Sequence, residues 1–311
     1  MTTRATEEVE QYEEAESGGA NEMRIRTLVV LPIVCLFASS HGVGQDFHEM
    51  TRDNGGWLFL DSADIPTVPH HLNHEAEFQK YVGGYNRAVL KAVDIVQTHA
   101  MDGGGYFTGI QASPTESPIG YELKLFDRSL LDPPRTTSYC SGSTYAVLIE
   151  ALNLIFPDGG SKLSSERFES LRMQEPDGSR REDRIKFWGK WNDDGWGSHY
   201  ALVQYSGMGE EIPPQRARPG DFMNISWTHG LGHSVVFLGW FKRNGEMGMV
   251  YWSSQKGTNG FGDIVSCPLT SVKSVKIVRL THPEKLFSFD IQKPVNRDLP
   301  GDRISIDPQV H

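Results

Sequence analysis

One segment constrains the fold more than any other: a cysteine stands where an extended polar stretch becomes an apolar helix. Pro133 and Pro134, followed by threonine and serine, favour extended backbone and then a helix cap. After Cys140, apolar residues recur at helical spacing, namely Tyr145, Leu148, Ile149, Leu152 and Ile155. The pattern predicts that Cys140 lies in the first turn of a buried helix.

This position gives Cys140 two alternative roles. The free N–H groups and the positive end of the helix dipole favour a thiolate, so a lowered pKa and a nucleophilic sulfur are expected. Alternatively, Cys140 is a small apolar residue packed under the helix start, since free cysteines are among the most buried residues. The small polar residues Ser141, Gly142 and Ser143 favour an open approach to the sulfur. This segment alone leaves both roles open.

The start of the chain differs from the rest. Residues 1–22 contain seven glutamates and one arginine, and we predict a disordered acidic prefix. Residues 23–44 have the basic, apolar and small-residue parts of a signal peptide. The apolar part, Leu28 to Ala38, is too short for a membrane-spanning helix of about 20 residues, and Cys35 lacks the neighbours of a lipoprotein cysteine. We therefore expect a secreted, periplasmic or cell-envelope protein, with no stable membrane insertion after signal removal.

Charge and cysteine content restrict the function further. The net charge is −10; the prefix contributes −6 and Arg24 with Arg26 add +2, so residues 45–311 carry −6. This acidic balance argues against nucleic acid as a partner. Residues 45–311 contain only Cys140 and Cys267, which excludes a disulfide framework. One bridge between them stays open, and it would block Cys140 as a nucleophile.

Three histidines, His70, His71 and His74, have a spacing that could offer metal ligands at a helix start. No cysteine or second cluster accompanies them in the sequence. We therefore favour a polar loop and helix cap, and expect neither a metal nor a cofactor.

The periodicity of the remaining chain predicts mixed α and β structure in three regions. Residues 45–114 form an N-terminal helical region with a helix from Glu75 to Thr98. Residues 115–280 form the main domain, and 281–311 form an extended C-terminal tail of little importance to stability. The strands expected in the main domain are 121–126, a strand from the turn at 218–223, 234–240, 249–254 across the Asn244-Gly245 hairpin, and 271–280.

Three tryptophans lie within nine residues, at Trp188, Trp191 and Trp196. Aromatic side chains this close together could line a groove that binds a sugar or peptide substrate. A wall of the hydrophobic core is the alternative.

A nucleophilic cysteine needs a base, and His233 is the best candidate. It follows Gly232 and opens an apolar strand, so nothing bulky blocks its ring. The alternative is a strand-edge histidine bonded to the backbone. His229 and His199 are lesser candidates, in a loop and on a helix.

The order of these motifs resembles the NlpC/P60 branch of the papain-like cysteine peptidases, over roughly residues 115–265. The similar segments are Cys140-Ser-Gly, then 198–205 with Gly207-Met-Gly-Glu-Glu-Ile-Pro, then Arg218-Pro-Gly-Asp-Phe-Met, and Gly232-His-Ser-Val-Val-Phe-Leu-Gly. The resemblance implies an α+β fold with a papain-like core, in which N-terminal helices and the nucleophile helix pack on an antiparallel sheet.

The chain departs from that family's pattern at three places. Tyr139 replaces a usual acidic residue, and the insert from Pro157 to Asp194 is long. The third catalytic residue is either Ser254 or Gln255.

The resemblance implies a secreted cysteine peptidase or amidase that hydrolyses a peptide amide, with a peptide or peptidoglycan-type substrate. A papain-like acyltransferase, which would need an apolar acyl groove, stays open as an alternative. So does an inactive glycan- or peptide-binding module on the same fold.

Overall fold

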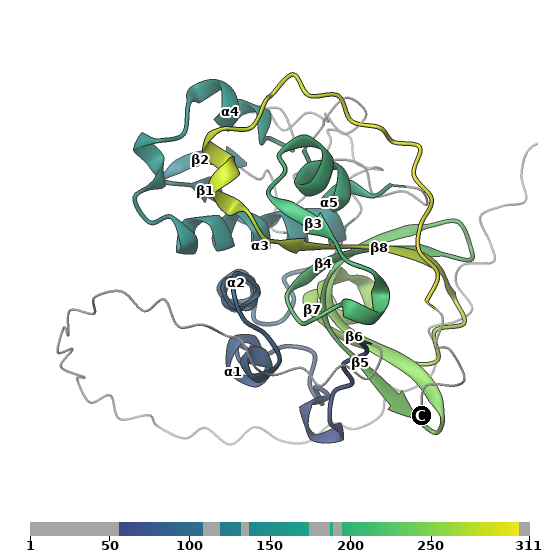
Figure 1. Cartoon of the computed structure of the whole chain (residues 1–311). Coiled ribbons are helices and arrows are strands. Elements are labelled where there is room, and N and C mark those ends of the chain that lie inside the picture. Colours follow the sequence, from purple (N-terminus) through teal and green to yellow (C-terminus); the bar gives the residue numbers. More distant parts are fainter. Residues whose placement is uncertain (1–55, 108–118, 132–136, 174–186, 189–194, 305–311) are drawn as a thin grey trace, which may run out of the picture. The chain divides into compact units, whose positions relative to one another are not determined.

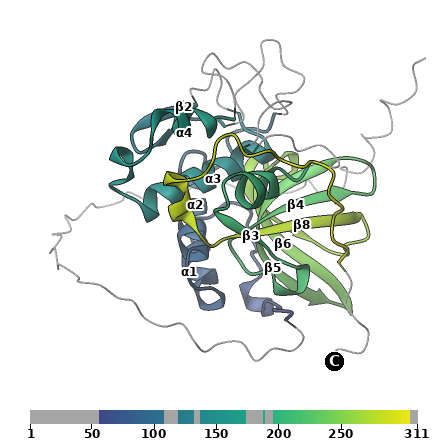
Figure 2. The same ribbon diagram turned by 45° about the horizontal axis from the view of Figure 1, so that its top comes forward.

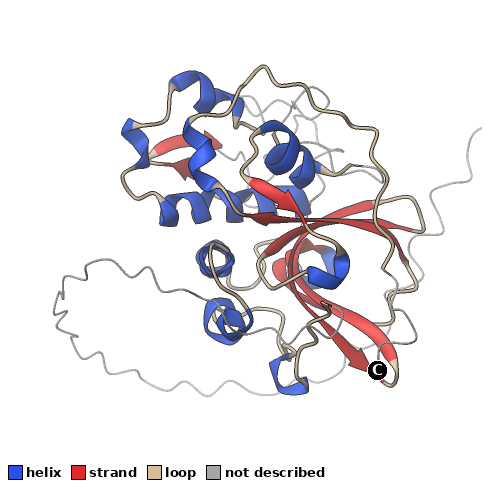
Figure 3. Cartoon of the chain, viewed as in Figure 1, coloured by secondary structure: helices blue, strands red, loops and turns tan. Residues whose placement is uncertain are grey.

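A computed structural model describes residues 56–107, 119–131, 137–173, 187–188 and 195–304 (Figure 1). All of them belong to one compact unit, Phe47–His311. This part of the chain is mixed α and β, with a six-stranded antiparallel sheet and several helices, which confirms the predicted mixed class (Figure 3). The predicted acidic prefix and signal peptide lie outside the described residues.

The N-terminal helical segment is interrupted where one helix from Glu75 to Thr98 is predicted. The helical backbone ends at Tyr81, because Val82 is extended, with φ −140° and ψ 156°. Gly84 then has a φ of +59°, in the left-handed region that glycine adopts most easily. The prediction of one continuous helix is therefore wrong. The described helices are α1 (His74–Phe78), α2 (Asn86–Thr98), α3 (Cys140–Ile155), α4 (Ser165–Ser170) and α5 (Gly197–His199), with a π-helical turn at Tyr200–Tyr205 and short 3₁₀ turns.

The main sheet has the strand order β3-β8-β4-β5-β6-β7, with every neighbouring pair antiparallel. Its strands are β3 (Gly209–Glu211), β4 (Asp221–Trp227), β5 (Gly232–Arg243), β6 (Glu246–Gln255), β7 (Gly260–Ser266) and β8 (Val272–Leu280). A separate two-stranded sheet contains β1 (Leu123–Leu125) and β2 (Arg128–Leu131). Strands β1, β4, β5, β6 and β8 match predicted segments, whereas β2, β3 and β7 are not predicted.

The turn between β5 and β6 has the conformation that its sequence predicts. Asn244 and Gly245 both have positive φ, at 54° and 81°. A two-residue turn with both residues in this region matches the twist of the strands that it joins, and Asn-Gly is its most common sequence. This turn sets the register of β5 and β6 from Arg243 opposite Glu246 to Gly239 opposite Val250.

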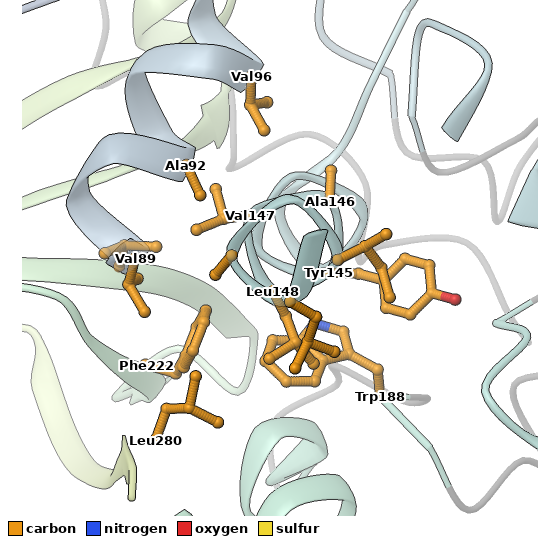
Figure 4. Packing of buried hydrophobic residues seen from close by; sticks show 14 of the residues in the cluster. Val89, Ala92, Val96, Tyr145, Ala146, Val147, Leu148, Trp188, Phe222 and Leu280 are labelled. Carbon is orange, nitrogen blue, oxygen red and sulfur yellow. The ribbon is translucent and has the colours of Figure 1, made fainter. Parts of the chain in front are cut away.

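Both faces of the sheet are buried, which explains the continuous apolar sequence of β5. Val236 and Leu238 belong to the core cluster on the helix side, and Val235 and Phe237 belong to a second cluster on the opposite face. Helices α2 and α3 lie next to each other beside the sheet (Figures 1 and 2). Figure 4 shows side chains of α2, β4, β8 and Trp188 gathered around α3. The helix that begins with Cys140 is therefore held from several sides.

The C-terminal segment, predicted as an extended tail, packs on the core in the described part of the chain. A 3₁₀ turn covers Pro283–Phe287, Leu286 is fully buried, and Phe289 is 6% exposed. Farther along, Asp302 pairs with Val275 of β8. The sequence gives no signal of this docking, because the segment has too few apolar residues to show a periodicity.

Candidate active site

Cys140 is the first residue of α3, as predicted, and is only 4% exposed. The end of β6 holds the start of this helix. The backbone N–H of Ser254 donates to Ser143 Oγ at 3.1 Å, and the hydroxyls of Ser138 and Ser254 lie 2.8 Å apart. Ser254, one of two candidates for the third catalytic residue, therefore positions the helix and bonds Ser138 and Ser143.

Trp188 fixes the first turn of α3 from another side. Its indole N–H donates to Ser141 O at 3.0 Å and to Thr144 Oγ1 at 3.1 Å. The Thr144 hydroxyl also lies 2.8 Å from Ser234 Oγ on β5. The cysteine is thus held against the strand that carries His233.

The sulfur of Cys140 faces the backbone N–H of Ser234, the residue that follows His233. The residue pairs between β5 and β6 begin at Val236, opposite Trp252. The ladder between these two strands therefore does not reach Ser234. The structure therefore brings the predicted nucleophile next to the predicted histidine position, although 93 residues separate them in sequence.

Gln255 is the residue that contacts His233, with 3.1 Å between Gln255 Oε1 and His233 Nε2. The amide nitrogen of Gln255 donates to Thr258 Oγ1 at 2.7 Å and to Gly262 O at 3.0 Å. Since those contacts fix which end of the amide is the donor, Oε1 must accept a hydrogen bond from Nε2–H. Neutral His233 then has an unprotonated Nδ1, the form that a general base requires.

The surroundings of Cys140 shift its thiol pKa upward, whereas a lowered pKa is predicted from the sequence. Burial raises the pKa of Cys140 to about 11, although the backbone N–H groups of Ser234, Ser141 and Cys140 oppose it. Burial also lowers the pKa of His233 to about 4, against the opposing effect of its bond to Gln255. The predicted lowered pKa is therefore wrong because desolvation outweighs the helix start. At neutral pH the pair rests as thiol and neutral imidazole.

Aromatic residues that the sequence analysis did not select surround this pair. The His233 ring centroid lies 5.7 Å from that of Tyr251 and 6.5 Å from that of Trp227. Burial, and then the charge of a Cys140 thiolate, raise the pKa of Tyr106 and Tyr251, so both phenols lie near the sulfur. The alternation of β6 places Tyr251 on the same strand face as Gln255, a signal that the sequence did contain.

Two of the three tryptophans predicted to line a substrate groove are buried in the interior of the protein. Trp188 is 1% exposed and Trp196 is 2% exposed, so both belong to the interior. The Trp196 indole N–H donates to Leu299 O at 3.0 Å. The groove prediction is therefore wrong for Trp188 and Trp196, and Trp191 lies outside the described residues.

The remaining candidates have other partners. His199 contacts Glu211, with 2.7 Å between Nε2 and Oε2, and His229 is exposed and stacked on Trp227. Cys267 is partly buried, and both it and Cys140 are free thiols. The predicted possibility of a bridge between them is not realised.

The three histidines near α1 have partners that are distant in sequence. His70 Nε2 lies 2.9 Å from Thr258 O, so its ring donates to that carbonyl. His71 and His74 both contact Asp263 of β7. His74 begins α1, in agreement with the predicted helix start, but Asp263 supplies the accompanying group that the sequence analysis did not find.

Two further findings define the surroundings. A cavity of about 370 Å³ lies at the far end of α3, where Glu150, Asn153 and Pro157 line it, and Cys140 is not among its lining residues. Within the described ranges, no helix has the length and apolar content needed to cross a bilayer.

No protein-family model, curated protein or solved structure matches this chain. The geometry of Cys140, His233 and Gln255 is therefore the basis for any functional assignment.

Proposed function

We propose that this protein is a cysteine hydrolase, a peptidase or amidase, in which Cys140 is the nucleophile and His233 the base. One observation carries the proposal: the Cys140 sulfur meets the backbone of β5 at Ser234, next to His233 in sequence, while Gln255 holds Nε2 of that imidazole. A nucleophile, a base and a residue that orients the base are the three parts that such a site requires.

In the proposed reaction, His233 Nδ1 takes the thiol proton as the sulfur attacks the carbonyl carbon of an amide. The carbonyl oxygen becomes negative, and the backbone N–H groups at the start of α3 are suited to stabilise it. The imidazolium then returns the proton to the leaving amine, and a thioester on Cys140 remains. Water, activated by the same imidazole, hydrolyses this thioester and restores the thiol.

The neutral resting pair is compatible with this reaction. Since the pKa of Cys140 is about 11 and that of His233 about 4, the proton stays on sulfur until a substrate displaces water from the site. Proton transfer is then coupled to attack, which is general-base catalysis.

The papain-like core belongs to the same proposal. It is supported by a nucleophile helix, α3, that packs against β5 and β6 of an antiparallel sheet, and by a histidine at the start of β5. The third polar residue, Gln255, ends the neighbouring strand. This arrangement agrees with the motif order that resembles the NlpC/P60 branch.

For the substrate we propose a peptide amide, including the peptides of cell walls, and for the location the cell exterior or envelope. The signal-peptide pattern of residues 23–44 supports export. Two apolar side chains near His233 offer contacts for a substrate side chain. They are the half-buried Trp227 at the end of β4 and the exposed Leu231 in the turn between β4 and β5.

The test is to incubate the purified chain with peptidoglycan fragments and with unrelated peptides, beside a Cys140→Ala variant. Mass spectrometry should detect a newly released amine that the variant does not produce. A product in which the acyl group has moved to another amine would identify a transferase. Equal products from both proteins, or none, would contradict a cysteine hydrolase acting on these substrates.

A further inference from the structure

A second group of reactive side chains lies apart from Cys140, between the segment before α1 and strand β7. It consists of His71, His74 and Asp263, and its candidate ligand atoms all lie within 4.8 Å of one another. Asp263 is 192 and 189 residues away from the two histidines in sequence. The fold, rather than a local motif, therefore assembles the group.

The distances within the group suit a tetrahedral metal ion. His71 Nε2 lies 2.9 Å from Asp263 Oδ2, and His74 Nε2 lies 3.1 Å from Asp263 Oδ1. Ligand atoms about 2.0–2.1 Å from a tetrahedral Zn²⁺ are separated by roughly 3.3 Å. The two imidazole rings are stacked, with centroids 4.2 Å apart, so both Nε2 atoms point to the same carboxylate.

The hydrogen bonds of His74 give an independent argument for a positive charge at this position. Asp94 Oδ1 lies 2.7 Å from His74 Nδ1 and also accepts the backbone N–H of His74 at 3.0 Å. Asp94 Oδ2 accepts the N–H of Glu75 at 3.1 Å. Asp94 is thus an acceptor throughout, and His74 Nδ1 must carry a proton. In neutral His74 the Nε2 lone pair would then face the anionic Asp263, so a positive charge, either a metal ion or a proton on Nε2, must lie between them.

We propose that His71 Nε2, His74 Nε2 and the Asp263 carboxylate bind a divalent transition-metal ion of the Zn²⁺ type. Two imidazoles and one carboxylate are a ligand set that zinc accepts, with water as the fourth ligand. Asp94 orients His74 through Nδ1–H, the usual role of a carboxylate behind a metal-bound histidine. His74 and Asp263 have side chains 0% and 1% exposed, whereas His71 is 9% exposed and lies on the side from which an ion would enter.

A proton is the competing occupant. Burial lowers the pKa of His74. The charge of Asp263, together with the hydrogen bonds that His74 forms with Asp263 and Asp94, outweighs burial and raises that pKa to about 9. The ion displaces this proton to solvent. His71 also moves its own proton from Nε2 to Nδ1, and loses the weak 3.3 Å bond from the N–H of Asn73.

The site would have a structural consequence for β7. Gly262, the residue before Asp263, accepts a hydrogen bond from Gln255, and the N–H of Asp263 donates to Pro69 O at 2.8 Å. An ion here would join β7 to the segment before α1. The proposal does not depend on the proposed hydrolase activity.

The experiment uses the full chain, first treated with a chelator and then titrated with Zn²⁺ in a calorimeter. Wild type should bind one ion per chain, and its melting temperature should rise. His71→Ala should weaken binding by at least about 100-fold, and Asp94→Asn by about 10- to 100-fold, because the carboxylate behind His74 is lost. His282→Ala is the matched control, since His282 is exposed and outside the group, and it should bind as wild type does.

Two outcomes would overturn the proposal. One is the absence of Zn²⁺ binding in wild type, and the other is binding that His71→Ala leaves unchanged. Co²⁺ provides a second measurement, because a tetrahedral Co²⁺ site absorbs strongly in visible light. Circular dichroism on each variant separates loss of the ligand from loss of the fold, and Asp263→Asn replaces His71→Ala if that variant does not fold.

Discussion

Replacing Gln255 by alanine should slow the reaction of Cys140 with iodoacetamide. In the folded protein Gln255 accepts from His233 Nε2–H at 3.1 Å and thereby keeps Nδ1 unprotonated, as the proposed base requires. Without Gln255 this tautomer loses one neutral hydrogen bond, worth about 0.5–1.5 kcal/mol. Because about 1.4 kcal/mol is a factor of ten, the rate should fall about 2- to 12-fold.

The assay is peptide mass spectrometry of Cys140 modification over time at pH 8. With a pKa of about 11, only about one thiol in a thousand is ionised by itself at that pH, so the proposed assistance by His233 should dominate the rate. Cys267 in the same sample is the internal reference, and Gln292→Ala, at an exposed glutamine, is the control. An unchanged Cys140 rate in Gln255→Ala would refute the role of Gln255.

Three further predictions concern stability. The folded pKa of His233 is about 4 against an ordinary value near 6.5, so its contribution is fully present above pH 6.5 and is lost as pH falls toward 4. The free energy of unfolding should fall by at most about 3 kcal/mol as a result. The free energies measured by urea unfolding for wild type and His233→Gln should therefore diverge between pH 6.5 and 4. Asp221→Ala should cost about 3–5 kcal/mol because it removes the buried partner of Arg279, whereas exposed Asp298→Ala should cost little. Leu286→Ala should cost about 2–5 kcal/mol in the same assay, and a cost near zero would contradict the docking of the C-terminal segment.

The elements that the sequence predicted best are those with strong local signals. The Asn244-Gly245 turn and the apolar run of β5 led to the correct hairpin, and the helical spacing after Cys140 led to α3. Strand β7 was missed because Gly260 and Gly262 resemble a turn, although both glycines pair with residues of β6. The strand propensity of a residue does not show whether a neighbouring strand will supply hydrogen bonds to it.

The candidate site was only partly predictable for the same reason. Cys140 and His233 stand at element boundaries that can be recognised in the sequence, but the choice between Ser254 and Gln255 depends on which side chain turns toward His233. The thiol pKa was predicted in the wrong direction, since the helix start is a local property and burial is not. Asp263 shares no local pattern with the histidines that it contacts.

The central claim is that Cys140 forms an acyl intermediate with His233 as its base. The most direct measurement is the intact mass and peptide map of the protein after brief mixing with an activated acyl ester. Wild type should carry one acyl group on Cys140, His233→Ala should acquire it much more slowly, and Cys140→Ala should lack it at that position. Acylation of Cys140 that is absent in wild type, or equally fast in His233→Ala, would contradict the account.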